Sequence, residues 1–493
     1  MSDTPAVRTR SANEAPIRPG GDYVLYWMAA ARRPRWNFAL QRAVERAQEL
    51  GKPLIVLETL ACGRRWDSDR LHRFVLEGMA DNSRSFEGKP VLYYPYVARR
   101  AEEEVALVRA LAESACVIVT DDFPAHEVPG VVAKVAGEAE AMVELVDSNG
   151  LLPMRAAEKV FPTAYSFRRF LQSELRQHLE SRPKRDPLAR MSLPQPRPLP
   201  KRIAERWPRA DDALLNGTAK ALAALPIDHS VPPVETRGGA RAATTALRTF
   251  LRQRLSRYTD ERNEPEQEVT SGLSPYLHYG HISAHQVLAE LMKAEGWSEN
   301  DLSHKATGSR SGWWGVSEPA EAFLDQLVTW RELGFNMAWQ QENHGRYESL
   351  PRWAKETLAD HAGDMRPRVY SFAQLEAGET YDALWNAAQM QLVREGRLHN
   401  YLRMLWGKKI LEWTPTPEEA AEVMVALNDR YALDGQDPNS YSGIFWVLGR
   451  YDRPWGPERP IFGKVRYMSS ENTARKIRVR NFIRNYEARQ DGG

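Results

Sequence analysis

The chain has 493 residues, more than one hydrophobic core usually supports, so two or three domains are expected. Its 42% hydrophobic and 27% charged residues are typical of a soluble globular protein, and no apolar run is long enough to span a bilayer. A net charge of +2 argues against binding of polyanions through bulk charge alone. The two cysteines, Cys62 and Cys116, lack metal-ligand spacing, which argues against a zinc site or a disulfide framework and favours a reducing compartment.

The N-terminal third alternates short apolar runs with helical patterns. Residues 1–20 have no apolar segment, and we expect a disordered tail there. The alternation that follows indicates a parallel sheet with helices on both faces, so residues 21–150 are predicted to form a doubly wound, Rossmann-like α/β domain. No GxGxxG fingerprint is present, so an ordinary dinucleotide site is not indicated. Strands are predicted over 22–28, 53–57, 91–94, 116–120 and 142–146, and helices over 37–50, 71–79 and 100–114.

The rest of the chain changes character. Residues 151–235 are interpreted as a connector, because 181–202 is too rich in Pro and Arg for continuous regular structure. Strand patterns nearly vanish afterwards, and residues 236–493 are predicted to form an all-helical domain. Helices are predicted over 240–258, 283–295, 319–337, 351–360, 381–395, 398–412 and 417–431.

The C-terminal stretch 464–484 is strongly basic, with seven Lys or Arg residues against the single acid Glu471. A local basic patch of this kind is typical of nucleic-acid contact. A solvated basic helix gives the same pattern, and both readings stay open here.

The segment 385–413 carries Trp385, Trp406 and Trp413. Trp406 and Trp413 are seven positions apart and share a helix face, a spacing that is most often core packing. Arg403 and Met404 lie in the same segment, which together with a downstream LDGQDPN turn suggests a buried redox flavin.

Two polar motifs could bind a ligand, but neither motif alone predicts a binding site. In TSGLSPYL, hydroxyl side chains precede a helix for which Ser274 is expected to be the N-cap and Pro275 an early residue, an arrangement suited to a phosphate and equally to an ordinary capped helix. The LDGQDPN segment offers carboxylates and amides to a polar heterocycle, but is also an ordinary turn composition.

Five blocks in order decide between these readings: TSGLSPYLHYGHIS, LWNAAQ, GRLHNYLRMLWGKKILEW, LNDRYALDGQDPNSYSGIFW and ERPIFGKVRYM. Together they resemble class II cyclobutane pyrimidine dimer DNA photolyases, in the photolyase/cryptochrome superfamily. The resemblance is dense over 258–485 and weaker in the N-terminal domain. It implies an antenna-type α/β domain, a helical FAD-binding domain, and light-driven repair in which excited reduced FAD passes an electron to a flipped-out dimer.

The resemblance also implies roles for individual residues. Around FAD, Arg403 and Asp434 are expected to pair beside the isoalloxazine, Asn428 to lie near N5, and Asp437 to contact the ring edge or ribityl chain. Electrons are expected to reach the flavin through Trp413, Trp385 and Trp406. The residues expected to contact the FAD pyrophosphate are Tyr258, Thr270, Ser271, Leu273 and Ser274. The residues expected to contact the dimer are Trp330, Met404 and Trp446. The residues expected to contact the rest of the DNA are Arg453, Lys464 and Arg466.

Three positions depart from the family pattern on the expected lesion side. Gln326 stands where the family usually has a glutamate, Gln286 where an arginine is common, and Asn400 where many members have glycine. An amide at Gln326 keeps hydrogen bonding but cannot carry charge or give up a proton.

Several broader expectations follow from the resemblance. Repair of UV-damaged DNA by a cytoplasmic monomer is the main one; the alternative is a cryptochrome-like blue-light photoreceptor with weak or no repair, which Gln326 and Gln286 favour. A flavin oxidoreductase is disfavoured because no nicotinamide-site signature is present. A deazaflavin antenna is implied, although no motif supports it independently. No metal is expected at the local histidines His278, His281 and His285.

Overall fold

The computed structural model describes residues 3–487 of the chain. It divides into two compact units, each assembled from several chain segments. Unit 1 comprises residues up to 157, 174–248 and 272–296, and unit 2 comprises 158–173, 249–271 and the residues from 297 onward. The domains expected from the sequence are contiguous, whereas these units interleave along the chain.

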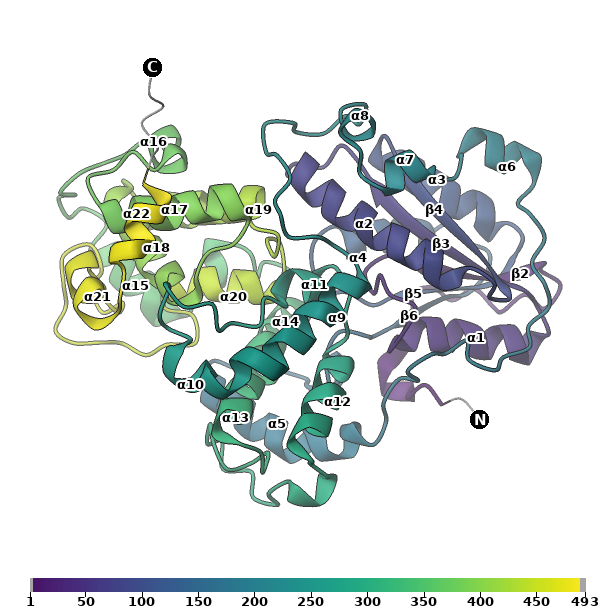
Figure 1. The fold of residues 1–493 in the computed structure, drawn as a ribbon, viewed down its shortest axis with the longest axis horizontal. Helices are drawn as coiled ribbons and strands as arrows, with labels where there is room; N and C mark the ends of the chain where they lie inside the picture. The colour runs from purple at the N-terminus through teal and green to yellow at the C-terminus, as the bar shows by residue number, and fades with distance from the viewer. Residues whose placement is uncertain (1–2, 488–493) are drawn as a thin grey trace. The chain divides into compact units, whose positions relative to one another are not determined.

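Unit 1 contains a six-stranded sheet in the order β1-β6-β5-β2-β3-β4 (Figure 1). All strand pairs are parallel except β1 with β6. Leu25 in the centre of β2 pairs with Ile55 on one side and Ile118 on the other. The strands are nearly continuous apolar runs because both faces are covered. Their bounds are β1 Thr9–Ser11, β2 Tyr23–Met28, β3 Leu54–Ala61, β4 Val91–Ala98, β5 Ala115–Asp121 and β6 Val143–Val146.

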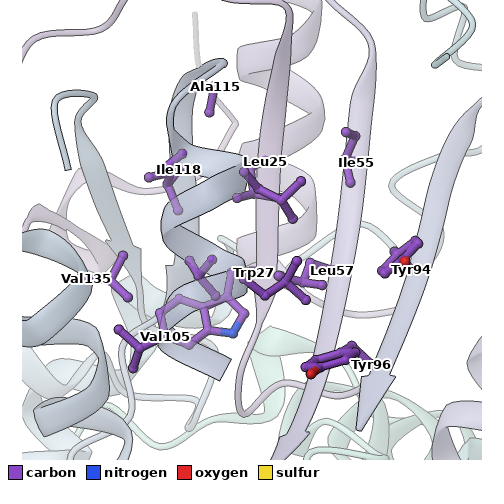
Figure 2. Packing of buried hydrophobic residues seen from close by; sticks show 14 of the residues in the cluster. Leu25, Trp27, Ile55, Leu57, Tyr94, Tyr96, Val105, Ala115, Ile118 and Val135 are labelled. Carbon is purple, nitrogen blue, oxygen red and sulfur yellow. The ribbon is translucent and has the colours of Figure 1, made fainter. Parts of the chain in front are cut away.

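Two hydrophobic cores cover the two faces of this sheet. On one face, Trp27 and its neighbours pack with residues of α3 (Ala101–Ala112) and α4 (Val128–Ala136), as Figure 2 shows for Val105 and Val135. On the other, α1 (Phe38–Leu50) and the end of α2 (Asp69–Phe86) pack on the strands. The doubly wound α/β architecture predicted from the sequence is therefore confirmed.

The expected disordered N-terminal tail is wrong for the described residues 3–20. Residues Thr9–Ser11 form the antiparallel edge strand β1, with Thr9 paired to Val146. The buried side chain of Arg8 lies 3.6 Å from the Asp147 carboxylate and donates to the carbonyl of Leu151 at 2.6 Å. A short strand and a buried charge pair order this segment. Neither feature requires a run of apolar residues, so the sequence pattern did not reveal the order. Residues 1 and 2 lie outside the description.

The expected connector is partly helical, because α5 (Ala164–Leu179) precedes the Pro- and Arg-rich stretch. Residues 181–200 form no helix or strand, as predicted for that composition. Short helices follow at α6 (Lys201–Arg206), α7 (Asp212–Leu215) and α8 (Ala219–Leu222), then α9 (Ala240–Thr249), α11 (Ser274–His278) and α12 (Ala284–Glu295).

The described part of unit 2 is helical and holds no β-strand, which confirms the all-α prediction. Helices continue with α10 (Tyr258–Glu261), α13 (Glu318–Leu324), α14 (Arg331–Gln340), α15 (Arg352–Asp360), α16 (Phe372–Ala377), α17 (Ala383–Glu395), α18 (Asn400–Trp413), α19 (Pro417–Tyr431), α20 (Pro438–Val447), α21 (Ser470–Lys476) and α22 (Arg480–Tyr486). Short 3₁₀ turns lie at Ala6–Arg8, Met154–Ala156, Leu255–Arg257, Glu299–Asp301 and Tyr347–Ser349.

Two of the predicted helices are interrupted by π-helical turns. The segment predicted over 240–258 contains one at Phe250–Arg254, and the segment predicted over 319–337 contains another at Asp325–Trp330. A π turn widens the helix locally and re-aims the side chains it carries, and such turns are frequent at functional sites. Gln326 and Trp330 both lie in the second turn.

The Asp325–Trp330 turn begins at a buried ion pair. Arg168 Nε lies 2.8 Å from Asp325 Oδ1, and both side chains are buried. Arg168 comes from α5, so the pair fastens this turn to a helix far away in the sequence.

Removing Arg168 leaves the Asp325 carboxylate buried without its counter-charge. We expect Arg168→Met to lower the free energy of unfolding by about 3–5 kcal/mol in urea denaturation. The exposed pair Arg352–Glu356 provides the control, and Arg352→Met should leave the unfolding free energy nearly unchanged. Equal effects of the two substitutions would contradict a role for burial.

Helices α14 and α20 approach so closely that only glycine fits at position 334. A Cβ there would lie 2.9 Å from the backbone N and Cα of Asn439 and from the Pro438 carbonyl oxygen.

We therefore expect Gly334→Ala to destabilise the protein by about 1–3 kcal/mol, because backbone atoms cannot yield as a side chain can. Gly345→Ala is the matched control, since its Cβ would meet Tyr441 at an ordinary 3.5 Å. Thermal and urea unfolding measure both variants, and a neutral Gly334→Ala would show that the helices separate freely.

Candidate functional site

A polar cluster lies where α18, α19 and the turn before α20 meet. Arg403 of α18 donates from Nη1 to Asn428 Oδ1 of α19 at 2.7 Å, and its Nη2 lies 3.8 Å from Asp434 Oδ1. Asp437 caps α20 by accepting from the Asn439 amide at 2.8 Å. The structure thus brings together three of the residues expected beside a flavin ring. The cluster presents one fixed cation with acceptors around it, a donor set that suits an anionic heterocycle.

The Asn428 amide is held at both ends. Its Nδ2 donates to Asp429 Oδ1 at 3.0 Å and to Ser440 Oγ at 2.9 Å. The Asp429 carboxylate in turn accepts hydrogen bonds from the backbone N–H of Gln436 and from the Tyr441 hydroxyl. Asp429 and Ser440 were not singled out from the sequence, because their importance depends on the fold of the LDGQDPN turn.

The residues expected at a pyrophosphate fall in two units, with Tyr258, Thr270 and Ser271 in unit 2 and Leu273 and Ser274 in unit 1. Ser274 is the first residue of α11, and Leu273 occupies the N-cap position without a side-chain cap. The expectation that Ser274 caps this helix is therefore wrong. Leu273 already has helical backbone angles, so the turn starts one residue earlier than the Ser-Pro pair indicates.

The three tryptophans of the 385–413 segment are fully buried, and Trp385 contacts both of the others. Trp385 Nε1 donates to the Trp406 carbonyl at 2.9 Å, and the rings of Trp385 and Trp413 lie 5.3 Å apart, edge to face. Trp406 Nε1 donates to Gln389 Oε1 at 2.8 Å. These contacts make the indoles part of the core and link the three tryptophans, through a ring contact between Trp385 and Trp413 and a hydrogen bond from Trp385 to the backbone of Trp406.

Two tyrosines extend this aromatic cluster beyond Trp413. Tyr370 lies 5.3 Å and Tyr381 5.6 Å from the Trp413 ring, and Tyr381 is 51% exposed. Lys409 places its ammonium 5.5 Å from the same ring. The buried indoles therefore connect to solvent through Tyr381, which the sequence did not single out.

The residues expected around a lesion include a facing pair of indoles. The rings of Trp330 and Trp446 lie 5.9 Å apart at 56°, and both are partly exposed. Met404 is buried on α18, and Asn400 is exposed at the start of that helix. Gln326 is partly exposed on the π turn. Gln286 lies on α12 in unit 1, so it is not grouped with the others.

A buried lysine stands one helical turn after Met404. Lys408 donates to the Val447 carbonyl of α20, and burial lowers its pKa to about 7. Its burial could not be predicted from the sequence, because lysine side chains are rarely buried.

The expected DNA side carries stacked arginines. Arg453 and Arg466 cover the ring of Trp455 at 4.8 and 4.9 Å, and Arg459 covers Tyr467 at 4.7 Å. Lys464 pairs with Glu458 at 3.1 Å. Cations held over aromatic rings are suited to contact with phosphates and unstacked bases.

Two histidines of the HYGHISAH segment pack against aromatic rings. His281 stacks on Phe74 at 5.2 Å, and His285 meets Phe38 edge to face at 5.4 Å. Burial lowers the pKa of His281 to about 3 and also lowers the pKa of His285, so both are neutral. Over residues 3–487, no group of three His, Cys, Asp or Glu residues is placed to hold a metal ion. No helix in that range has the length and apolar character needed to cross a membrane.

Known proteins similar to this chain agree on one family. This chain is 33% identical over 478 residues to the deoxyribodipyrimidine photo-lyase of Methanothermobacter thermautotrophicus, and the alignment covers 97% of both chains. It is 32% identical over 468 residues to the Arabidopsis thaliana deoxyribodipyrimidine photo-lyase, covering 93% of this chain and 88% of the relative. No protein-family model matches the sequence.

Solved structures agree with the fold. A class III photolyase from Agrobacterium tumefaciens aligns with a TM-score of 0.67 at 18% identity, covering 94% of this chain and 86% of that one. A Synechocystis cryptochrome aligns with a TM-score of 0.62 at 14% identity, covering 94% and 88%. Because the near full-length relatives above share this name at 32–33% identity, the chain belongs to the deoxyribodipyrimidine photo-lyase family.

Proposed function

We propose that the protein is a class II photolyase that binds FAD and uses light to split cyclobutane pyrimidine dimers in DNA. The observation that carries this is the position of α18, which bears Arg403 at the polar cluster, Met404 one residue on, and Trp406 at the start of a buried indole path. The near full-length relatives named deoxyribodipyrimidine photo-lyase support the reaction class.

The polar cluster fits the isoalloxazine of FAD. Arg403 is a largely buried guanidinium, and it is oriented by Asn428 and Asp434. Such a cation stabilises negative charge on the ring system. When bound in its reduced form, FAD supplies a light-excited one-electron donor. Asp437, together with Tyr258, Thr270 and Ser271 of the same unit, is proposed to hold the remainder of the cofactor, and the contacts expected of Leu273 and Ser274 stay predictions.

The indoles are proposed to bring electrons inward from the surface. Trp413 is completely buried, so the path needs an exposed end, and Tyr381 provides one. Trp385 then bridges to Trp406, which is three residues from Arg403 and on the same side of α18.

The Trp406→Phe variant tests this path. Phe keeps most of the packing but is far harder to oxidise, so photoreduction of bound FAD should be lost while FAD stays bound. Absorbance during blue-light illumination with a thiol reductant measures it. Trp207→Phe, in the other unit, is the control and should photoreduce normally. Undiminished photoreduction in Trp406→Phe would refute the assigned path.

The lesion is proposed to bind between the two indoles Trp330 and Trp446. Their partial exposure and 56° inclination leave ring faces on which flipped pyrimidines can stack. Removing the dimer from the duplex costs a few kcal/mol, and least for a base pair that is already damaged. Gln326, Asn400 and Met404, all in unit 2, are proposed to line the lesion, and a lesion contact for Gln286 in unit 1 stays a prediction.

The DNA backbone is proposed to contact Arg453, Lys464, Arg466 and the basic stretch 464–484. Phosphate contacts of this kind give most of the affinity and make it dependent on salt. A monomeric state, a cytoplasmic location and a deazaflavin antenna in the α/β unit stay predictions.

A blue-light photoreceptor of the cryptochrome type is the second candidate. Gln326 favours it, because an amide cannot supply a proton or a charge to a dimer that has gained an electron. The indole path and the cofactor cluster serve either function equally, so repair itself must be measured.

Illuminating the photoreduced protein with dimer-containing DNA separates the two candidates. We expect the wild type to remove dimers and Gln326→Glu to do so several-fold faster, because a carboxyl group can supply the charge or the proton that an amide cannot. Gln374→Glu adds the same charge in an exposed capping box, where Glu serves as well as Gln, and should not change the rate. No dimer loss in either protein, with intact photoreduction, would favour the photoreceptor.

A further inference from the structure

The side chain of Asn428 is 1% exposed and fully engaged on its amide nitrogen. Its two N–H groups go to Asp429 Oδ1 and Ser440 Oγ, while its oxygen accepts from Arg403 Nη1. An amide oxygen has two lone pairs, so one acceptor position remains, and no donor position remains.

The orientation of this amide follows from the chemistry of its partners. A guanidinium can only donate, so the atom facing Arg403 must be the oxygen. A carboxylate can only accept, so the atom facing Asp429 must be the nitrogen. If the amide were flipped, its N–H groups would face the guanidinium and its oxygen would face the carboxylate. Hydrogen bonds would then be lost at both contacts, which would raise the free energy of this arrangement.

Asp429 itself is held in place. It is 1% exposed and accepts from the Gln436 amide at 3.0 Å and from the Tyr441 hydroxyl at 2.9 Å. Burial and the neighbouring carboxylate raise the pKa of Tyr441, so its hydroxyl keeps its proton and remains a donor. The Gln436 bond goes to Oδ1, the oxygen that also accepts from Asn428, and holds that oxygen in place, whereas the Tyr441 bond goes to Oδ2.

We propose that Asp429 is a positioning residue that locks Asn428 as a hydrogen-bond acceptor toward the flavin and thereby favours reduced flavin over oxidised flavin. This rests on the proposed function, in which Asn428 lies near flavin N5. Oxidised N5 bears a lone pair and no proton, whereas two-electron reduction adds a proton there. An acceptor-only partner therefore stabilises the reduced cofactor and offers nothing to the oxidised one.

The decisive variant is Asp429→Asn, which is nearly isosteric but can donate as well as accept. It weakens the lock, because a flipped Asn428 can then find a partner at residue 429 and is opposed only by Arg403. We expect the midpoint potential of bound FAD, measured by dithionite titration with absorbance, to shift to more negative values. Asn428→Ala should shift it in the same direction, since it removes the acceptor altogether.

Two further variants separate orientation from general disturbance. Tyr441→Phe removes a neighbour of Asp429 but keeps its bond to Asn428, and the potential should stay at the wild-type value. Ser440→Ala removes the other acceptor of the Asn428 amide and should give a smaller shift in the direction of Asp429→Asn. If Asp429→Asn does not fold or retain FAD, Ser440→Ala carries the test.

The failures are distinguishable. Wild-type protein that does not bind FAD would sink the proposed function as a whole. FAD bound at wild-type affinity with an unmoved potential in both Asp429→Asn and Ser440→Ala would overturn only the role of Asp429. An equal shift in Tyr441→Phe would do the same, because it would show that disturbance of the pocket, not the amide lock, sets the potential.

Discussion

A guanidinium that is largely removed from water must be solvated by the protein, and Arg403 imposes this requirement on unit 2. Its partners Asn428 and Asp434 come from α19 and from the turn that follows it. Both must approach α18 closely, which a side chain on the contact face would prevent. Gly407 allows it, because a Cβ there would lie 2.8 Å from Met424 of α19 and from Val447 of α20. The polar cluster is thus a consequence of how three helices pack.

Core packing and electron conduction are compatible uses of the same indoles. Trp385 and Trp406 satisfy their N–H groups with a carbonyl and with Gln389, so their burial carries no unpaired donor. Trp413 differs, since its Nε1 has no acceptor within the described residues. Close packing, which stabilises the fold, also provides the short ring separations that a relay needs. The sequence spacing could not separate the two uses because they depend on the same positions.

The proposed lesion side is built differently from the cofactor side. Gln326 and Trp330 lie on a π turn that begins at Asp325 and is fastened by Arg168. The sequence predicts an uninterrupted α-helix over 319–337, without this turn. Substitutions such as glutamine for glutamate therefore sit on a locally widened helix, whose geometry depends on an ion pair to a distant helix.

The sequence by itself determined the strands and helices with clear periodicity, as at β2, β3 and α19. These depend on local patterns of apolar residues and on caps such as Asn37 and Gly51, which act over a few positions. The ordered blocks also indicated the family and the residues Arg403, Asn428 and Asp434 that meet in one cluster. What only the tertiary structure decided are the edge strand β1, the π turns, the interleaving of the units, and partners such as Asp429 and Gln389. Each of these depends on groups brought together by packing, a long-range effect that no local pattern in the chain encodes.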